Sequence, residues 1–445
     1  MLDKIARELE KYKYAEAMLS NGRYNSISLK DGEVDAVKEG ETQNIAFRVY
    51  ENGFFGFAVS NTFENFEGLL KKAGKMAKAG AGKATIGRAE VNEGKVEVKP
   101  KKDPAGYALE DKIGMLKEFE SAARAEKIHS TNLVYSDSST ENSFLSSLGA
   151  KTVEKEARVH AGLFAYAKAG NRLESAYDQV KERAGLEALA GFEKKAVSAA
   201  QEAKLLLGAG AAPKGRMTCV LDPELAGVMA HEAMGHACEA DGIQINDSVL
   251  RGKLGKKLGS EAFAIRDSPV LPARMWGSYA FDDEGTRSKG TTLFEGGVLK
   301  AYITSLESAG QLGGKLTGNA RSDFSGMQIV RMSNTYFEKG SAQTEELFEG
   351  VREGVYLVGC KEGQVSPKTG NFTFAAKYGY TIKDGDKERL VKNCSINGNI
   401  LSSLHGIDLV ASDLDFSPGT CGKDGQEAPV TTGSPHLRIN GIVVG

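Results

Sequence analysis

Two histidines, His231 and His236, flank Glu232 in an H-E-x-x-x-H arrangement whose side chains are of the types that hold and use a metal ion. The better-known zinc motif has its histidines four residues apart, because that spacing places both imidazoles on one face of a helix. At about 100° per residue, a spacing of five turns the second ring by roughly 140° on an ideal helix. Gly235 directly precedes His236, and glycine tolerates the distortion of a π-bulge. We therefore predict an irregular helix at Gly235 that brings both imidazoles to one metal.

A catalytic zinc site needs a third protein ligand, and the residue types leave its identity open. Cys238 lies seven residues after the first histidine. The rise between them is about 10 Å, so joint ligation would require the helix to break. Glu239 and Asp241 follow the helix within reach, and Cys421 stands in a Gly-flanked turn, PGTCGKDGQ. The alternative is that the histidines are ordinary helix residues satisfied by hydrogen bonds, and that Cys421 is a small buried residue in a turn.

The helix that carries the motif has a clear start. A short strand over residues 217–221 is followed by Asp222, Pro223 and Glu224, which are an N-cap acid, a first-turn proline and a first-turn acid. The motif helix is therefore expected to begin at Pro223.

The remaining pattern predicts an α+β fold. Expected helices cover 3–19, 69–79, 109–125 and 182–207, hairpins run from residue 26 to 60 with turns at Asp31-Gly32 and Asn52-Gly53, and a helical tract covers 344–353. We expect an N-terminal α/β domain, residues 1–213, with an antiparallel sheet and helices. A β-rich, barrel-like C-terminal catalytic domain, residues 214–445, is entered through the metal-binding helix.

Composition excludes several classes of function. The chain has 445 residues, with 57 Lys and Arg against 59 Asp and Glu and a net charge of -2, so no basic excess attracts nucleic acid. Five cysteines are an odd number for a secreted disulfide framework, and residues 1–20 lack a signal-peptide pattern. The longest nearly apolar tract, 205–212, is too short to span a membrane. We expect a cytoplasmic protein with no nucleic-acid or membrane partner.

Several motifs together resemble the TldD/PmbA family, also called modulator of DNA gyrase. They are HEAMGHACEADG, DDEGT at 282–286, GVLKAYITS at 297–305, RMSNTYF at 331–337 and CGKDGQEAPVTTGSPHLRI at 421–439, and RVYENGFFGFAVSNTF at 48–63 resembles the family's opening sheet. In that family the H-E-x-x-x-H is present in TldD and missing from its partner TldE (PmbA). The resemblance implies a TldD-type zinc metalloprotease subunit in which His231, His236 and Cys421 hold Zn²⁺.

The implied reaction is metal-assisted hydrolysis of a peptide bond, in which zinc activates a water molecule and Glu232 accepts its proton. A β-rich domain with an exposed edge could bind an extended peptide by strand addition. The resemblance implies unfolded or short peptides as substrates, bound in a cavity of a homodimer or of a heterodimer with a TldE/PmbA-type subunit. The oxyanion-stabilising residue is left open among Tyr302, Tyr336, His405 and His436.

Two other classes of function fit the same residues. One is a non-catalytic peptide-binding or regulatory protein with a structural zinc site closed by Cys238 or an acid. The other is a thiol hydrolase that uses Cys421 with a histidine such as His405.

Overall fold

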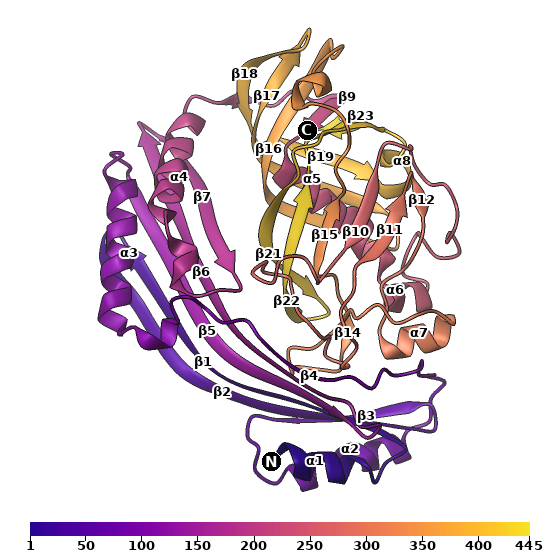
Figure 1. Cartoon of the computed structure of the whole chain (residues 1–445). Coiled ribbons are helices and arrows are strands. Elements are labelled where there is room, and N and C mark those ends of the chain that lie inside the picture. Colours follow the sequence, from indigo (N-terminus) through magenta and orange to yellow (C-terminus); the bar gives the residue numbers. More distant parts are fainter.

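The computed structural model describes residues 1–445, and the N-terminal part of the chain forms one long curved sheet flanked by helices (Figure 1). Its elements are α1 (Leu2–Leu9), β1 (Tyr14–Lys30), β2 (Glu33–Glu51), β3 (Phe54–Ser60), α2 (Phe66–Ala79), β4 (Glu93–Glu97), α3 (Leu109–Arg124), β5 (Ser130–Ser146), β6 (Lys151–Ala169), β7 (Arg172–Glu182) and α4 (Phe192–Leu206). The strand order is β3-β2-β1-β5-β6-β4, with β7 also paired to β6. All of these pairings are antiparallel except β4 with β6.

The C-terminal part is made mostly of strands. Its elements are β8 (Gly210–Ala211), β9 (Gly215–Leu221), α5 (Pro223–Met229), α6 (Ala240–Gln244), β10 (Ala264–Asp267), β11 (Thr291–Glu295), β12 (Val298–Leu299), α7 (Leu306–Leu312), β13 (Ala320–Arg321), β14 (Ile329–Val330), β15 (Asn334–Phe337), β16 (Glu353–Val365), β17 (Asn371–Lys383), β18 (Asp386–Lys392), β19 (Ser395–Asn399), α8 (Ile400–Ser403), β20 (Ile407–Val410), β21 (Asp415–Lys423), β22 (Gln426–Ser434) and β23 (Leu437–Val444).

Five of these strands close into a barrel. The order β16-β9-β23-β19-β17 returns to its start because β16 also pairs with β17. A second sheet, β12-β11-β10-β15-β22-β21, lies beside the barrel, and α5 packs between the two (Figure 1). The α+β class with a barrel-like C-terminal region, entered through the motif helix, is therefore confirmed. The division of the chain after residue 213 stays a prediction.

The first predicted helix is wrong in length. Helix α1 ends at Leu9, and the residues from Tyr14 onward form strand β1. Ala15 and Ala17 pack toward α1 and α2, whereas Tyr14 and Met18 pack against the C-terminal part of the chain. Because this strand is buried on both faces, its apolar residues lack the alternation that distinguishes a strand from a helix.

Two other helix predictions were too long. Gly191 has a φ of 83°, and helix α4 begins at the next residue. Of the expected helix 182–207, only Phe192–Leu206 is α-helical. Residues before it belong to β7 and to a 3₁₀ turn, Leu186–Leu189. The tract 344–353 contains only the 3₁₀ turn Thr344–Leu347, because β16 begins at Glu353. Helices α2 and α3 lie where they were predicted.

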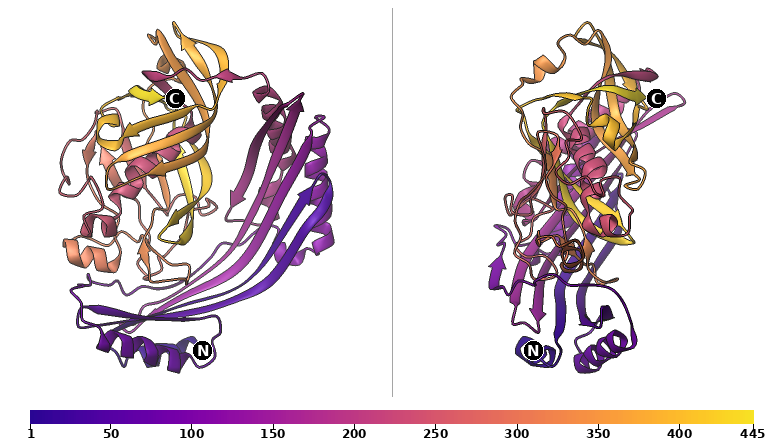
Figure 2. Two further views of the ribbon diagram at one scale, coloured as in Figure 1. Left: turned by 180° about the vertical axis from the view of Figure 1, so that it is seen from behind. Right: turned by 90° about the vertical axis from the view of Figure 1, so that its right-hand side faces the viewer.

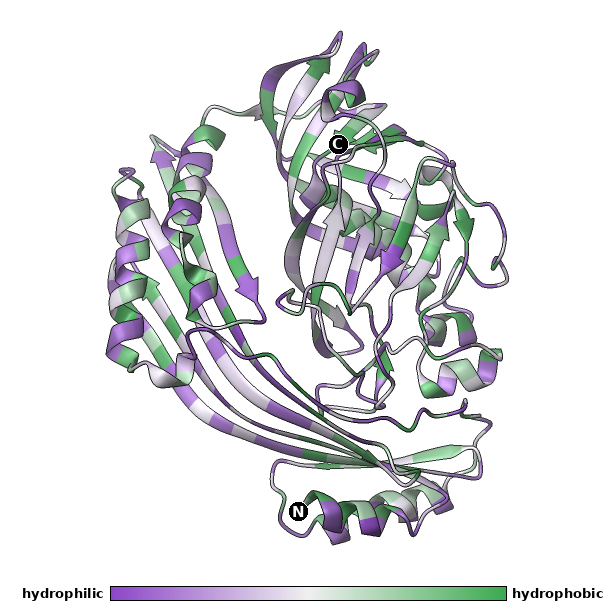
Figure 3. Ribbon diagram, in the orientation of Figure 1, coloured by the Kyte–Doolittle hydropathy of each residue, from purple (hydrophilic) through white to green (hydrophobic).

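The long sheet passes below and beside the C-terminal part, as the two further views show (Figure 2). Helices α3 and α4 carry both hydrophobic and hydrophilic residues (Figure 3), and their apolar residues form a core with β5, β6 and β7. No helix in the structure is both long enough and apolar enough to cross a membrane.

Buried ion pairs join the sheet to the C-terminal part. Arg48 of β2 contacts Glu16 at 2.5 Å and Glu284 of the DDEGT segment at 2.6 Å. The second oxygen of Glu284 accepts a hydrogen bond from the Leu306 amide, the first residue of α7, at 2.5 Å. The DDEGT segment is therefore a connection between the N-terminal sheet and the helix α7.

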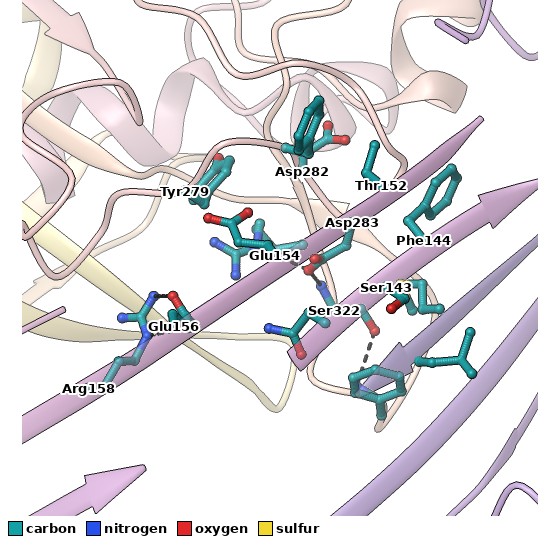
Figure 4. Close-up of a pocket in the computed structure, with 16 residues that line it drawn as sticks. Ser143, Phe144, Thr152, Glu154, Glu156, Arg158, Tyr279, Asp282, Asp283 and Ser322 are labelled. Carbon is teal, nitrogen blue, oxygen red and sulfur yellow. Dashed lines mark hydrogen bonds and ion pairs between the residues drawn. The ribbon is translucent and has the colours of Figure 1, made fainter. Parts of the chain in front are cut away.

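A second set of charged residues lines a cavity of about 90 Å³ between the sheet and the C-terminal part (Figure 4). Glu156 and Arg158 of β6 form an ion pair at 3.0 Å, and Arg158 donates to the carbonyl of Trp276 at 2.6 Å. Glu154 accepts a hydrogen bond from the Ala280 amide at 3.1 Å. Arg183, 2% exposed, pairs with both glutamates.

Candidate metal centre

The helix that carries H-E-x-x-x-H changes its winding at the motif. It begins at Pro223 as predicted, and α5 ends at Met229. A π-helical turn then spans Ala230–Gly235, and the amide of His236 donates to the carbonyl of His231. Because such a turn contains one more residue than an α-turn, residues five apart return to nearly the same side. The predicted irregularity at Gly235 is confirmed.

Gly235 also provides space for a neighbouring side chain. A β-carbon at this position would lie 1.9 Å from Sδ of Met332. The absence of a side chain therefore lets the turn approach the segment before β15.

The structure brings together the side chains of His231, His236 and Cys421. One donor atom from each residue lies within 4.8 Å of the others, and all three residues are buried. The two imidazole rings are 5.1 Å apart with their planes at 82°, and Sγ of Cys421 lies 3.3 Å from Nε2 of His236. His231 lies in the π-turn and His236 begins the 3₁₀ turn that follows it, His236–Cys238. Cys421 lies in strand β21, so its predicted place in a Gly-flanked turn is wrong.

The donor set fits a zinc ion. Both ring nitrogens of His231 are buried without a hydrogen-bond partner, although buried polar atoms usually have one. Burial alone raises the pKa of the Cys421 thiol, but the imidazoles of His231 and His236 outweigh it and lower the pKa from 9.0 to about 4. The thiolate is the form that binds metal, and two imidazoles with one thiolate are typical zinc ligands.

Glu232 lies beside this cluster. Its Oε2 atom is 3.7 Å from Nε2 of His236, and its side chain is 21% exposed, so solvent and a substrate can reach it. Burial raises the pKa of Glu232, and the two imidazoles only partly oppose that effect. A carboxylate with a raised pKa accepts a proton more readily than an ordinary one.

A buried arginine holds the hairpin that presents Cys421. Arg331, in the RMSNTYF segment, donates to the carbonyl of Cys421 at 2.5 Å and to the carbonyl of Gln426 at 3.0 Å. These contacts bind both strands of the β21–β22 hairpin near its turn. They explain why a residue far from the motif helix can be presented to it in a fixed position.

A groove of about 840 Å³ passes the cluster. Its lining includes Glu232, His236 and Cys421, together with residues 327–330 and 363–365. The carboxylate of Glu232, an imidazole and a thiolate therefore face a space large enough for several residues of a peptide.

Glu239 and Asp241, two other candidates for the third ligand, line the groove but are paired with Lys423, whereas the remaining candidates from the sequence lie elsewhere. Cys238 is fully buried in the hydrophobic core, and burial raises the pKa of its thiol, so it does not join the cluster. The four candidates for oxyanion stabilisation also do not line the groove: Tyr302, Tyr336, His405 and His436. Tyr302 donates to the carbonyl of Leu250 instead. His436 binds Tyr356 and Asp413.

Sequence reasoning assigned no role to Lys423 or to the β16 edge. Lys423 contacts Glu239 at 3.1 Å and Asp241 at 2.8 Å, next to the candidate ligands. Alternation along β21 could have identified it, because Lys423 and Cys421 are two residues apart in one strand. No sequence signal distinguishes Gly363 of β16, which lies close to Glu232.

Comparison with known proteins identifies relatives over the whole chain. Family models of the PmbA/TldA metallopeptidases match residues 15–79 (domain 1), 102–207 (central domain) and 214–445 (C-terminal domain). A metalloprotease of Methanothermobacter thermautotrophicus is 37% identical over 100% of this chain and 98% of its own length. The zinc metalloprotease TldD homolog of Saccharolobus solfataricus is 36% identical over 53% of each chain.

The fold has a solved counterpart. The crystal structure of TldE from Thermococcus kodakarensis superimposes with a TM-score of 0.79 at 19% identity, covering 100% of this chain and 99% of that chain. The fold, the site and the relatives together define a metallopeptidase. The chain belongs to the PmbA/TldD family.

Proposed function

We propose that this chain is a zinc-dependent peptidase of the TldD type that hydrolyses unfolded or short peptides. The observation that carries the proposal is the convergence of His231, His236 and Cys421, whose donor atoms lie within 4.8 Å of one another. Glu232 beside them supplies a carboxylate that faces the groove. The relative named zinc metalloprotease TldD homolog, which matches 53% of this chain, adds support.

The three donors would hold the zinc ion, leaving a fourth position free. A zinc ion bound there supplies a Lewis acid that polarises a carbonyl group and acidifies water. Glu232 takes a proton from the attacking water and delivers it to the leaving amine, for which its raised pKa is suited. His231 and His236 would serve only as ligands, and the groove walls hold the peptide beside Glu232.

The free edge of β16 supports binding of an extended peptide. The strand pairs with β17 throughout but with β9 only over Gly354–Leu357. Just after β16, the amide of Ser366 points toward β17 and donates to the carbonyl of Asn371 at 2.9 Å. Backbone groups alternate between the two sides in an antiparallel pair, so those of Gly363 and Val365 point away from β17, toward the groove that both residues line.

This edge runs next to the proposed base. A β-carbon at Gly363 would lie 3.3 Å from Cγ of Glu232. A peptide added to the edge would therefore present its carbonyl groups close to Glu232. Recognition through backbone hydrogen bonds would tolerate many side chains.

We further propose that the working form is a dimer whose groove is enclosed by a second subunit, either another copy or a TldE/PmbA-type chain. The shared fold with TldE supports a subunit of similar shape as partner. All five cysteines are free thiols, which supports the proposed cytoplasmic location.

A specific observation also favours one alternative function, a thiol hydrolase. The low pKa of Cys421, about 4, and its contact with His236 also suit a thiolate nucleophile. His405, the partner expected from the sequence for such an enzyme, does not line the groove. A chelator separates the possibilities, because it silences a zinc peptidase, unfolds a protein with structural zinc and leaves a thiol hydrolase active.

The substitution Glu232→Gln tests the proposed function. We expect the variant to keep its fold and its zinc and to lose hydrolysis of an unfolded polypeptide by at least about 100-fold, the scale of a lost general base. Glu307→Gln is the matched control, because Glu307 also lines the groove but lies outside the ligand cluster. Near-normal turnover by Glu232→Gln would contradict the proposal.

A further inference from the structure

We propose that Glu239 and Lys423 are positioning residues that hold the zinc-binding side chains in place before the metal arrives. The inference rests on the proposed zinc site. It starts from Nδ1 of His236, which lies 3.0 Å from Oε2 of Glu239. The side chain of Glu239 is 3% exposed, so this contact is made away from bulk water.

The hydrogen bond to Glu239 selects the tautomer of His236. A histidine that binds a metal is neutral, and in that form the single ring proton of His236 lies on Nδ1, where it is donated to the carboxylate, while the lone pair of Nε2 is free. That nitrogen is the one that faces Sγ of Cys421 at 3.3 Å. Metal-bound histidines commonly have a carboxylate on the other ring nitrogen, which fixes the ring orientation and raises the basicity of the ligand.

Lys423 contacts the same oxygen of Glu239, Oε2, that His236 does. Its Nζ atom lies 3.1 Å from Glu239 and 2.8 Å from Asp241, and it donates to the carbonyl of Val330 at 3.0 Å. Asp241 in turn accepts a hydrogen bond from the Val330 amide at 3.1 Å. The ammonium group thus neutralises a buried carboxylate that would otherwise be costly to leave unpaired.

The contacts of Lys423 with Glu239 and Asp241 join the two elements that supply the zinc ligands. Cys421 and Lys423 are two residues apart in β21, so their side chains leave the same face of the strand. Glu239 and Asp241 directly follow the turn that carries His236. Lys423 therefore fixes the strand that presents the thiolate to the helix that presents the imidazoles.

A half-buried pair elsewhere in the C-terminal part serves as a comparison. Lys377 contacts Glu224 at 2.9 Å, with exposures of 21% and 31%, and so resembles the Lys423 pairs in type. Neither residue belongs to the ligand cluster. Loss of this pair should lower stability without changing the metal site.

The test is the zinc affinity of the purified full-length protein, measured by competition with a chromogenic chelator. We expect Glu239→Gln and Lys423→Met each to weaken zinc binding by about 10 to 100-fold, the usual effect of removing a residue that supports a metal ligand. Lys423→Arg should restore part of the affinity, and Lys377→Met should bind zinc as the wild type does. In cobalt-substituted protein, the thiolate-to-metal absorption band should shift in the first two variants only.

The outcomes separate this inference from the proposed function. Wild-type zinc affinity and an unshifted cobalt band in both Glu239→Gln and Lys423→Met would overturn the inference and leave the zinc peptidase standing. A wild-type protein that binds no zinc would overturn both. If Lys423→Met does not fold, the nearly isosteric Glu239→Gln decides the question by the same two measurements.

Discussion

Sγ of Cys421 lies 3.3 Å from Nε2 of His236, although 185 positions separate the two residues in the sequence. The contact depends on a π-turn that rotates His236 and on Arg331, which holds the carbonyl of Cys421. Burial raises the pKa of the Cys421 thiol, but His231 and His236 together lower it from 9.0 to about 4. The chain thus presents a thiolate and two imidazoles to one point before any metal is considered.

The π-turn should not tolerate a side chain at Gly235. In Gly235→Ala the new β-carbon, in its ideal position, would lie 1.9 Å from Sδ of Met332. Overpacking of this kind costs about 1–3 kcal/mol of unfolding free energy. We expect a lower midpoint of thermal unfolding and weaker zinc binding.

Gly114→Ala is the control for that experiment. Gly114 lies within α3, and a β-carbon there would meet no atom within 4 Å. This variant should be as stable as the wild type or more so, because alanine favours the helix by up to about 1 kcal/mol. Equal stability and zinc binding in the two variants would refute the role assigned to Gly235.

Substrate binding to the β16 edge should require an extended chain. A folded protein has its backbone hydrogen bonds already paired, so we expect cleavage of an unfolded polypeptide and little or none of the same polypeptide in its native form. A proline near the cut should slow cleavage, because it removes a donor that the added strand needs. The assay compares both forms of one polypeptide and peptides with single prolines, and equal rates throughout would exclude strand addition.

Acid stability should depend on Glu156. Burial raises the pKa of this carboxyl, but Arg158 and Arg183 outweigh burial and lower it from 4.5 to about 2. The ionised form therefore stabilises the fold above about pH 4.5, and this contribution is lost as the pH falls toward 2. We expect Glu156→Gln to lower the free energy of unfolding at pH 7 by about 3 kcal/mol and to flatten its dependence on pH below 4.5.

Denaturant titrations across that pH range measure the effect. Glu141→Gln is the matched control, because Glu141 pairs with Lys155 near the surface at 41% exposure for both side chains. Exposed pairs contribute at most about 1 kcal/mol. A Glu156 variant that loses no more stability than the Glu141 variant would contradict the role of the buried pair.

Local signals in the sequence predicted part of this structure well. Asp222 and Pro223 identified the start of the motif helix, because an N-cap acid and a first-turn proline act within one turn. Gly235 identified the π-turn, because a glycine permits a local distortion of the helix at its own position. The first helix was extended too far because β1 is buried on both faces and gives no alternating pattern around Ala15 and Ala17.

The third ligand could not be derived from spacing. Cys421 meets His236 through tertiary contacts made by a distant hairpin, and no local rule relates the two positions. Only the resemblance to a family selected Cys421 over Cys238, Glu239 and Asp241. The contacts of Lys423 depend on the same tertiary arrangement. The sequence placed Cys421 in a turn, so the alternation of Cys421 and Lys423 along strand β21 was not predicted.

The zinc content of Cys421→Ser tests the central claim most directly. Elemental analysis of the purified wild-type chain should give one zinc per chain, and the variant should retain only a small fraction of it, since a hydroxyl replaces the thiolate that two imidazoles stabilise. Circular dichroism of the same samples checks that the fold is kept. One zinc per chain in both proteins would remove Cys421 from the site and contradict the account.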